Sequence, residues 1–467
     1  MNLKKMLASV ITVAVMAAAV PMTGLLSDPL GLTADAVTYD EYGLYIQNQI
    51  LRSVSADITD LFIPEDVTRI AAGAFSNCKN LTFISIPASV ISINATFSSC
   101  TKLETISVDY GNEKYSSIDG VLFNYEGTEL IAYPPGREEE TYYAPLGLEV
   151  IKSNAFSGSK YLTNIELRYG VKNIGGFSNC IRLKSINIPP TTTAIAANAF
   201  SGCRSLEKID VDEGNTKFSS IDGVLFNADK TKLIQYALGK VNTSYSVPQG
   251  VTEIGENAFS GSENLESIVI SDSVKTIGAN AFSDCITLTD LNISGSVAEI
   301  GLKAFMGCER LTSVNIPSGV QVIGAGAFSD CIRLTGLTLP DSLTEIGNGA
   351  FSGCKNLKSA TIYGSPKLGD AIFENGTLIY GERGSSVEKY VDEYRGTLNY
   401  FFSSISSELK GDANDDGVVN LADLTAMLSH IVGKNMLTGF GRNNADVNSD
   451  GLVDIQDVIL TLKICVS

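Results

Sequence analysis

Two acidic stretches near the C-terminus carry oxygen-bearing side chains in the same order: GDANDDGVVNLADL and, 34 residues further on, ADVNSDGLVDIQDV. A twelve-residue calcium loop needs oxygen ligands at positions 1, 3, 5, 7, 9 and 12, and a glycine at position 6 for its sharp turn. Gly417 and Gly451 stand at position 6. The ligands predicted for two calcium ions are Asp412, Asn414, Asp416, the Val418 carbonyl, Asn420 and Asp423 in the first loop, and Asp446, Asn448, Asp450, the Leu452 carbonyl, Asp454 and Asp457 in the second.

The charge of this segment couples its folding to calcium. Residues 411–467 contain eight aspartates against only Lys434, Arg442 and Lys463. Carboxylates that are crowded into one loop repel each other unless a cation neutralises them. We therefore expect the segment to be largely unfolded without calcium, so that calcium also controls the binding of a partner.

The elements that must position these loops are helices on their C-terminal side. LADLTAMLSHIVGK follows the first loop and IQDVILTLKICVS follows the second, whereas no apolar helix precedes either loop. This loop-helix duplication over residues 411–467 resembles a type I dockerin, a small all-α, EF-hand-like domain. The resemblance implies binding to a cohesin module of a scaffoldin, and hence membership of a cellulosome-type complex.

In the dockerin family, partner choice depends on loop positions 10 and 11 and on the exposed face of the following helix. The residues that match those positions here are Leu421, Ala422, Ile455 and Gln456. Many family members carry a Ser-Thr-like pair there, so these residues depart from that pattern and favour a hydrophobic contact. The two copies also differ from each other, which argues against a two-fold symmetric binding mode.

The N-terminus has the pattern of a secretory signal. Two lysines precede an apolar run from Met6 to Val20, and an A-x-A sequence ends at Ala36. We expect residues 1–36 to be a signal peptide that is removed; a cut after Ala19 and an uncleaved membrane anchor are the alternatives. No later stretch approaches the length of a transmembrane helix, so we expect the mature protein to be extracellular.

Residues 37–402 are dominated by a repeat of about 23 residues, marked by a phenylalanine. Each unit reads as a short strand such as LTSVNIP, a turn, a second strand such as VQVIG, and a one-turn helix such as AGAFSDC. No unit can bury its apolar side chains alone, so the units must stack into an α+β leucine-rich-repeat solenoid. The marker residues are Phe75, Phe97, Phe156, Phe177, Phe200, Phe259, Phe282, Phe305, Phe328, Phe351 and Phe373.

Two longer intervals interrupt the repeat and are copies of each other. DYGNEKYSSIDGVLFNYEGTELIAYPPG begins at Asp109 and DEGNTKFSSIDGVLFNADKTKLIQYALG at Asp212, so a whole block of repeats is duplicated. Each insert, over about 109–146 and 212–248, is expected to contain a β-hairpin. Residues 378–402 predict a strand-helix-strand cap, and the serine-rich residues 403–410 predict a linker to the dockerin-like segment.

The recurring pattern I-P-x-x-V-x-x-I-G-x-x-A-F-x-x-C-x-x-L resembles the BspA-like leucine-rich repeats of bacterial secreted and surface proteins. The resemblance covers residues 60–400. It implies a solenoid that offers an adhesion or protein-binding surface. The function is the weaker part of this inference, since one fold serves many functions.

Eight of the nine cysteines lie three residues after a marker phenylalanine: Cys78, Cys100, Cys180, Cys203, Cys285, Cys308, Cys331 and Cys354. Two repeats carry Ser159 and Ser262 at that position instead. The tolerance of serine favours small buried side chains in one column over obligatory pairing. Disulfides between a few neighbouring repeats remain the alternative, whereas a single column does not converge four ligands on zinc.

Histidine-dependent nucleophile systems are excluded from the repeats by composition, whereas a carboxylate pair for glycoside cleavage is not. His430 is the only histidine and lies on a helix of the dockerin-like segment, so the repeats cannot hold a Ser-His-Asp or Cys-His nucleophile system. The net charge of −18 argues against a nucleic-acid or anionic-membrane binder. Trp is absent, so stacking on sugars would need the tyrosines of the first insert: Tyr110, Tyr115, Tyr125, Tyr133, Tyr142 and Tyr143.

A ligand of the solenoid would most simply bind its regular strand face. The outward residues of the first strands are largely polar: Ser85, Ser107, Glu166, Asn187, Asp210, Val269, Asn292, Asn315, Thr338 and Thr361. The sequence therefore favours a secreted, non-catalytic binding or adhesion protein tethered to a scaffoldin on the cell surface, serving polysaccharide catabolism or attachment to a host. A structural spacer is the alternative, and an unrecognised glycan-active enzyme is a third hypothesis.

Overall fold

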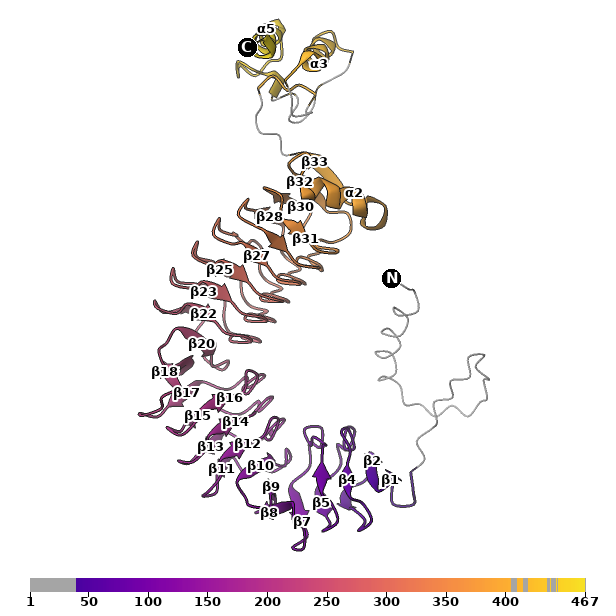
Figure 1. The fold of residues 1–467 in the computed structure, drawn as a ribbon, viewed down its shortest axis with the longest axis vertical. Coiled ribbons are helices and arrows are strands. Elements are labelled where there is room, and N and C mark those ends of the chain that lie inside the picture. The colour runs from indigo at the N-terminus through magenta and orange to yellow at the C-terminus, as the bar shows by residue number, and fades with distance from the viewer. Residues whose placement is uncertain are drawn as a thin grey trace, which may run out of the picture.

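The structure is a computed structural model that describes residues 39–404, 410–414, 419–434, 437, 442 and 444–466. The predicted signal peptide, Asp416, Val418 and most of the predicted linker lie outside these residues. From β1 to β33 the chain forms a curved stack of short strands (Figure 1). No helix in the described part of the chain is long and apolar enough to cross a membrane.

Within each sheet the first strand of a repeat pairs in parallel with the first strand of the next repeat, because stacked repeats place equivalent residues side by side. Residues 311–317 (LTSVNIP), which the sequence predicts as such a strand, form no strand in the structure, so the prediction was wrong for this repeat. The first strands form four separate sheets rather than one. The sheets are β3 (Asp60–Phe62), β5 (Phe83–Ile86) and β7 (Thr105–Val108); β11 (Thr141–Tyr143), β13 (Asn164–Glu166), β15 (Ser185–Ile188) and β17 (Lys208–Val211); β21 (Ser244–Ser246), β23 (Ser267–Val269) and β25 (Asp290–Asn292); and β28 (Gly336–Leu339), β30 (Ser359–Ile362), β32 (Leu378–Gly381) and β33 (Phe401–Ser404).

The second strands are mostly two residues long and pair in the same one-repeat register. An antiparallel hairpin, β1–β2, starts the first of their sheets. The sheets are β1 (Leu44–Gln47), β2 (Ile50–Val54), β4 (Arg69–Ile70) and β6 (Ser92–Ile93); β8 (Tyr115–Ile118), β9 (Val121–Asn124), β10 (Glu129–Ala132), β12 (Val150–Ile151), β14 (Asn173–Ile174) and β16 (Ala194–Ile195); and β18 (Phe218–Ile221), β19 (Val224–Asn227), β20 (Lys232–Gln235), β22 (Glu253–Ile254), β24 (Thr276–Ile277), β26 (Glu299–Ile300), β27 (Val322–Ile323), β29 (Glu345–Ile346) and β31 (Lys367–Leu368).

The marker phenylalanines stack on one another inside the solenoid, and Tyr133 and Tyr236 of the inserts begin the columns that continue through Phe156 and Phe259. The ring of Phe305 lies 5.0 Å from that of Phe282 and 5.1 Å from that of Phe328, and both pairs are stacked. All three side chains are fully buried. This stacking confirms the predicted repeat solenoid, since each repeat completes its core only with its neighbours.

The third side of each repeat consists of successive turns where the sequence suggested a one-turn helix. The Phe282 N–H donates to the Ala304 carbonyl at 2.7 Å, and the Phe305 N–H donates to the Ala327 carbonyl at 2.7 Å. These bonds run to the next repeat, so they compete with the bonds that would close a helix within one repeat.

The column cysteines are buried and unpaired, as the tolerance of serine predicts. The Cys308 thiol donates to the carbonyl of Phe282 in the preceding repeat at 3.2 Å, and Cys331 repeats this contact with Phe305 at 3.3 Å. Burial raises the pKa of the Cys285 thiol to about 12, so this thiol remains protonated. Such thiols act as small apolar side chains that also satisfy a carbonyl.

Each insert is a three-stranded antiparallel unit, one strand more than the predicted hairpin. In the first insert β8 pairs with β9 and β9 pairs with β10, and the second insert repeats this with β18, β19 and β20. The last strand of each unit then pairs in parallel with the next repeat, through β12 and β22. Each insert therefore joins the second-strand sheet of the repeats that follow it, whereas both the first-strand and the second-strand sheets of the preceding repeats end before it.

At its C-terminal end the solenoid is covered by β32, helix α2 (Ser386–Leu398) and β33, the order that the sequence suggests for the cap. Ser385 caps the helix N-terminus, and Val387, Tyr390 and Val391 are buried against the last repeat. The Tyr400 hydroxyl donates to the Phe373 carbonyl at 2.6 Å. The cap thereby replaces the missing neighbour of the last marker phenylalanine.

Candidate calcium loops and docking face

The second acidic loop closes around its first residue. The Asp446 carboxylate accepts the N–H of Asp450 at 3.0 Å and the N–H of Gly451 at 2.9 Å. Gly451 has a φ of 89°, a conformation that glycine adopts at little cost. The position-6 glycine thus makes the turn for which the sequence pattern requires it.

The last residue of this loop, Asp457, reaches back across it. Its carboxylate accepts the N–H groups of Val447 at 2.8 Å, Asn448 at 3.2 Å and Asp454 at 3.0 Å. Asp457 is fully buried and lies in the first turn of helix α5 (Ile455–Val466). The helix N-terminus favours this anion, so the helix and the loop position one carboxylate together.

The first loop repeats this arrangement where the structure describes it. Asp423, in the first turn of helix α3 (Leu421–Ile431), accepts the N–H groups of Asn414 at 3.0 Å and Asn420 at 2.8 Å. Asp423 and Asp412 are buried, and Asn420 caps the helix. The predicted ligands Asp416 and Val418 lie outside the described residues.

The two loops are tied to each other and share a small core. The Lys410 ammonium donates to the Asp446 carbonyl at 2.7 Å, and the Gly411 N–H donates to the Asn444 carbonyl at 2.8 Å. Between the helices, the Thr461 hydroxyl donates to the sulfur of Met427 at 3.5 Å. Only three apolar side chains are fully buried in this cluster: Ala413, Met427 and Ala445.

The donor chemistry of both loops suits a hard cation. Side-chain and carbonyl oxygens are the ligands that calcium takes, and the loops offer neither imidazole nor thiol. Within the described ranges no three His, Cys, Asp or Glu residues form a metal cluster. The buried ends of the loops, Asp412, Asp423 and Asp457, fit a site for a neutralising cation.

The four residues predicted to choose the partner are all exposed. Leu421 and Ile455 have exposed fractions of 71% and 55%, and Ala422 and Gln456 are also at the surface. Both apolar residues continue into stripes along their helices that the sequence reading did not single out. The stripe on α3 adds Leu428 and Val432, and the stripe on α5 adds Ile459, Leu462 and Val466.

The spacing i, i+4, i+7 and i+11 is common to both stripes, and it is the signal that could have found them. On α3 these positions are Leu421, Thr425, Leu428 and Val432, and on α5 they are Ile455, Ile459, Leu462 and Val466. The two copies are therefore more alike on their exposed faces than loop positions 10 and 11 indicate.

His430 serves a structural role in this region. Its Nδ1 accepts the N–H of Leu437 at 3.1 Å, at the end of helix α3. Because that nitrogen is engaged by the backbone, it is not available as a general base.

The solenoid divides the tyrosines of the first insert into two groups. Tyr115 is partly buried and accepts the Ile93 N–H at 3.0 Å, while Tyr133 and Tyr142 pack their rings against Phe156. The other three are exposed: Tyr110, Tyr125 and Tyr143. Three of the six tyrosines therefore pack within the fold, and the other three are available at the surface.

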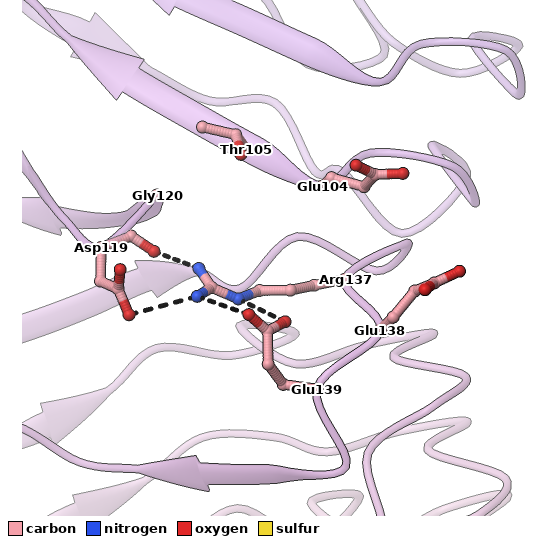
Figure 2. Close-up of a pocket in the computed structure, with 7 residues that line it drawn as sticks. All are labelled: Glu104, Thr105, Asp119, Gly120, Arg137, Glu138 and Glu139. Atoms are coloured by element: carbon pink, nitrogen blue, oxygen red, sulfur yellow. Dashed lines mark hydrogen bonds and ion pairs between the residues drawn. The ribbon is translucent and has the colours of Figure 1, made fainter.

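A pocket of about 710 Å³ lies beside the first insert, lined by Glu104, Thr105, Asp119, Gly120, Arg137, Glu138 and Glu139 (Figure 2). Arg137 forms ion pairs with Glu139 at 2.8 Å and with Asp119 at 3.2 Å, and it also donates to the Asp119 carbonyl. Burial opposes ionisation of Glu139, but the hydrogen bond and charge of Arg137 outweigh it and lower the pKa of Glu139. An ionised Glu139 cannot act as the general acid of a glycosidase.

Comparison with known protein families agrees with this architecture. The family described as BspA type leucine rich repeat region matches residues 45–138, 138–244 and 231–358, and the dockerin type I domain matches residues 410–463. The chain belongs to the BspA-type leucine-rich repeat family and carries a C-terminal type I dockerin domain. Both resemblances read from the sequence are thereby confirmed.

Solved structures with the same fold come from bacterial proteins. A leucine rich cell surface protein from Faecalibacterium prausnitzii is 25% identical with a TM-score of 0.50, covering 67% of this chain and 90% of its own. The pneumococcal vaccine antigen PcpA is 21% identical with a TM-score of 0.48, covering 79% of this chain and 99% of its own. No curated protein matches the chain.

These families define the class of the protein. Type I dockerins are calcium-binding modules that bind cohesins in cellulosome-like assemblies, and leucine-rich repeats are protein-interaction modules. Neither family is catalytic, and both typically occur in extracellular bacterial proteins.

Proposed function

We propose that this protein is a secreted, non-catalytic binding protein that docks onto a cohesin of a scaffoldin and presents its solenoid as a recognition surface. The observation that carries the proposal is the pair of equivalent loop-helix units. Asp423 and Asp457 hold their loops through the same backbone N–H positions, so both loops have the form that a calcium ion would complete.

Two calcium ions would be held by the loop residues predicted from the sequence. Their carboxylate, amide and carbonyl oxygens are the ligand types that calcium takes. Bound calcium would neutralise the buried carboxylates of Asp412, Asp423 and Asp457 and so stabilise the orientation of α3 and α5.

The docking face would be formed by the two apolar stripes. A stripe of exposed leucine, isoleucine and valine on a helix is the surface that buries well against a partner. Leu421 and Ile455 connect each stripe to its loop, so calcium binding and docking would depend on the same helix ends.

The test measures binding of the full-length protein to a panel of purified cohesin modules by calorimetry. A cohesin should bind in millimolar calcium and not in excess chelator. Leu428→Asp and Leu462→Asp, alone and combined, show whether one stripe or both contact the cohesin. If one particular stripe is used, one of the two single substitutions abolishes binding. If the two stripes are interchangeable, only the combined variant loses binding. Unchanged binding in chelator, or in the double variant, contradicts the proposal.

The matched control introduces the same charge away from the dockerin. Val241 lies on the second insert with an exposed fraction of 86%. Val241→Asp should leave cohesin affinity unchanged, because it changes net charge without touching α3 or α5.

A further inference from the structure

The duplicated block offers an internal comparison at the level of single residues. Residue n and residue n+103 are equivalent from Glu104 to Val171 without a gap, so each position of the first insert has a counterpart in the second. The buried positions keep their character: Phe123 matches Phe226, and Tyr133 matches Tyr236. Where an exposed position carries an apolar residue in one copy and a polar residue in the other, the requirements of the fold therefore do not explain the apolar residue.

The largest differences lie at one loop position that recurs once per repeat, three residues after the outward position of the first strand. Tyr110, Leu146 and Tyr169 occupy it in the first block, with exposed fractions of 103%, 83% and 81%. Their counterparts in the second block are Glu213, Gln249 and Asp272, which are also exposed. Tyr143, 64% exposed on β11, is likewise replaced by Ser246.

These four apolar side chains, which we call the apolar row, lie on neighbouring repeats. Strands β11 and β13 pair with Tyr143 opposite Glu166, so Leu146 and Tyr169 lie about one strand spacing, ~4.8 Å, apart along the stack. The Arg168 Nε donates to the Ala144 carbonyl at 2.8 Å and joins their two loops. Tyr110 follows β7, on the other side of the first insert.

The acidic pocket lies at the opposite end of β11. Glu139 precedes Tyr143 by four residues, roughly 13 Å of extended chain. The pocket opens there because β7 and β11 are not paired, so the first-strand sheet is interrupted. Glu104 and Glu138 face this gap, are exposed, and make no ion pair with a described residue (Figure 2).

The corresponding gap in the second block has lost this charge. There, Lys208 replaces Thr105, Val241 replaces Glu138 and Asn242 replaces Glu139. The Lys240 ammonium donates to the Asp222 carbonyl at 2.6 Å, in the place of Arg137. The first gap holds four carboxylates against one guanidinium, whereas the second holds two carboxylates against two ammonium groups.

We propose that the face formed by the apolar row and by Glu104 and Glu138 binds a protein segment whose apolar side chains are flanked by lysine or arginine. The inference rests on the proposed role of the solenoid as a recognition surface. It specifies where that surface lies and which class of ligand it binds. Tyrosine with leucine is the composition of a protein interface, and the unpaired carboxylates are complementary to basic side chains.

The chemistry favours a protein over a neutral glycan. The exposed tyrosines of the row offer aromatic faces to a sugar ring as well as to a protein, so the charge beside them carries the distinction. A neutral glycan gains nothing from the excess of negative charge at the pocket, whereas a cationic side chain gains both attraction and faster association.

The test uses the counterpart residues as substitutions, because the second block shows that the fold accepts them. A random dodecapeptide display library is selected on the full-length protein and on the variant Tyr143→Ser/Leu146→Gln/Tyr169→Asp. The wild-type protein should enrich peptides with apolar residues beside Lys or Arg, and these peptides should bind the variant at least tenfold more weakly. Glu138→Val should weaken them less, and more at low salt than at high salt.

The matched control changes the same positions of the second block, as Ser246→Ala/Gln249→Ala/Asp272→Ala, and should leave peptide binding unchanged. The proposal is overturned if no such peptides are enriched, or if they bind the variant as well as the wild type. It is also overturned if the row instead mediates self-association in sedimentation, or if a glycan array gives binding that the triple variant loses.

The same preparations separate this proposal from the proposed function. Cohesin binding through the dockerin is measured on the wild type and on the triple variant. Retained cohesin binding with no peptide enrichment overturns only the solenoid surface, whereas peptide enrichment without any cohesin binding overturns only the tethering role.

Discussion

The solenoid and the dockerin are stabilised by opposite means. The solenoid buries stacked phenylalanine, isoleucine and cysteine side chains, and Ile254, Ile277 and Ile300 of successive second strands pair in register with no exposed surface. The dockerin buries few apolar side chains but places Asp412, Asp423 and Asp457 out of water. One domain is held by burial of apolar surface, which needs no ligand, and the other requires its buried charge to be neutralised.

This difference matches the different tasks of the two domains. A recognition surface gains from permanent rigidity, because no ordering cost is then paid on binding. A docking module whose folding depends on an ion binds only where that ion is abundant.

Removing calcium should have the largest effect. Excess chelator should unfold the dockerin and leave the solenoid folded, because only the dockerin holds clustered buried carboxylates. Circular dichroism of the full chain should lose the helical signal of α3 and α5, while the solenoid's thermal transition stays in place. A solenoid transition that moves with chelator would show that the two domains are not stabilised independently.

Phe305→Ala should act on the solenoid alone. It deletes a ring that stacks on both neighbours in a fully buried column, which costs about 3–5 kcal/mol of unfolding free energy. Denaturant unfolding followed by tyrosine fluorescence measures the loss. Leu302→Ala, at a half-exposed site on the same repeat, is the matched control and should cost far less. Calcium affinity should stay unchanged in both variants, because neither substitution touches the dockerin. A loss of calcium affinity would contradict the separation of the domains.

Alkaline pH should weaken the solenoid before it affects docking. Burial raises the pKa of Cys285 to about 12 and that of Cys308 well above its ordinary value. The folded state therefore keeps protons that the unfolded chain releases above about pH 8.5, so stability is complete below that pH and falls as pH rises. Each such thiol should cost about 1.4 kcal/mol per pH unit between the unfolded and folded pKa values.

Thermal unfolding between pH 8 and pH 11 checks this dependence. Cys285→Ser should flatten the pH dependence, and native thiols should resist alkylation until the solenoid unfolds. A column that is readily alkylated at pH 8 would contradict the burial of these side chains.

The smallest effect is expected at the apolar row. Leu146→Gln copies Gln249 of the second block, and a surface exchange of this kind changes the unfolding free energy by less than about 0.5 kcal/mol. Differential scanning calorimetry of the variant measures it. A larger loss would mean that Leu146 supports the fold, which would remove the basis for reading it as a binding residue.

Much of the fold could be predicted because its information is local and repeated. The spacing of the marker phenylalanines gives the period, and the alternation of apolar residues in segments such as SINI of β15 gives the strand faces. The extra strand β8 was missed because YSSI has only one strongly apolar residue. The sequence suggested one-turn helices on the third side. The structure has turns there because the backbone hydrogen bonds run between repeats, and no single segment reveals such bonds.

The calcium loops stay a prediction from ligand types at fixed positions. In the structure the position-12 aspartates, Asp423 and Asp457, accept backbone N–H groups of their own loops. The apolar stripes that contain Leu428 and Leu462 could also have been predicted from the sequence. Their signal is the spacing of apolar residues along one helix face, not the positions of the calcium-loop motif. The division of the first-insert tyrosines into packed and exposed groups was not predictable, since Tyr142 and Tyr143 are adjacent in sequence and differ only in which way the strand turns them.

The sequence by itself determined the repeat, its duplication, and the order of oxygen ligands in the two loops, because these depend on spacing along the chain. Only the tertiary structure decided which side chains reach the surface and which gaps open between repeats. Leu146 becomes part of a row, and Glu138 part of a pocket, through neighbours that stacking brings to them. That juxtaposition arises from packing between repeats, and no single repeat contains it.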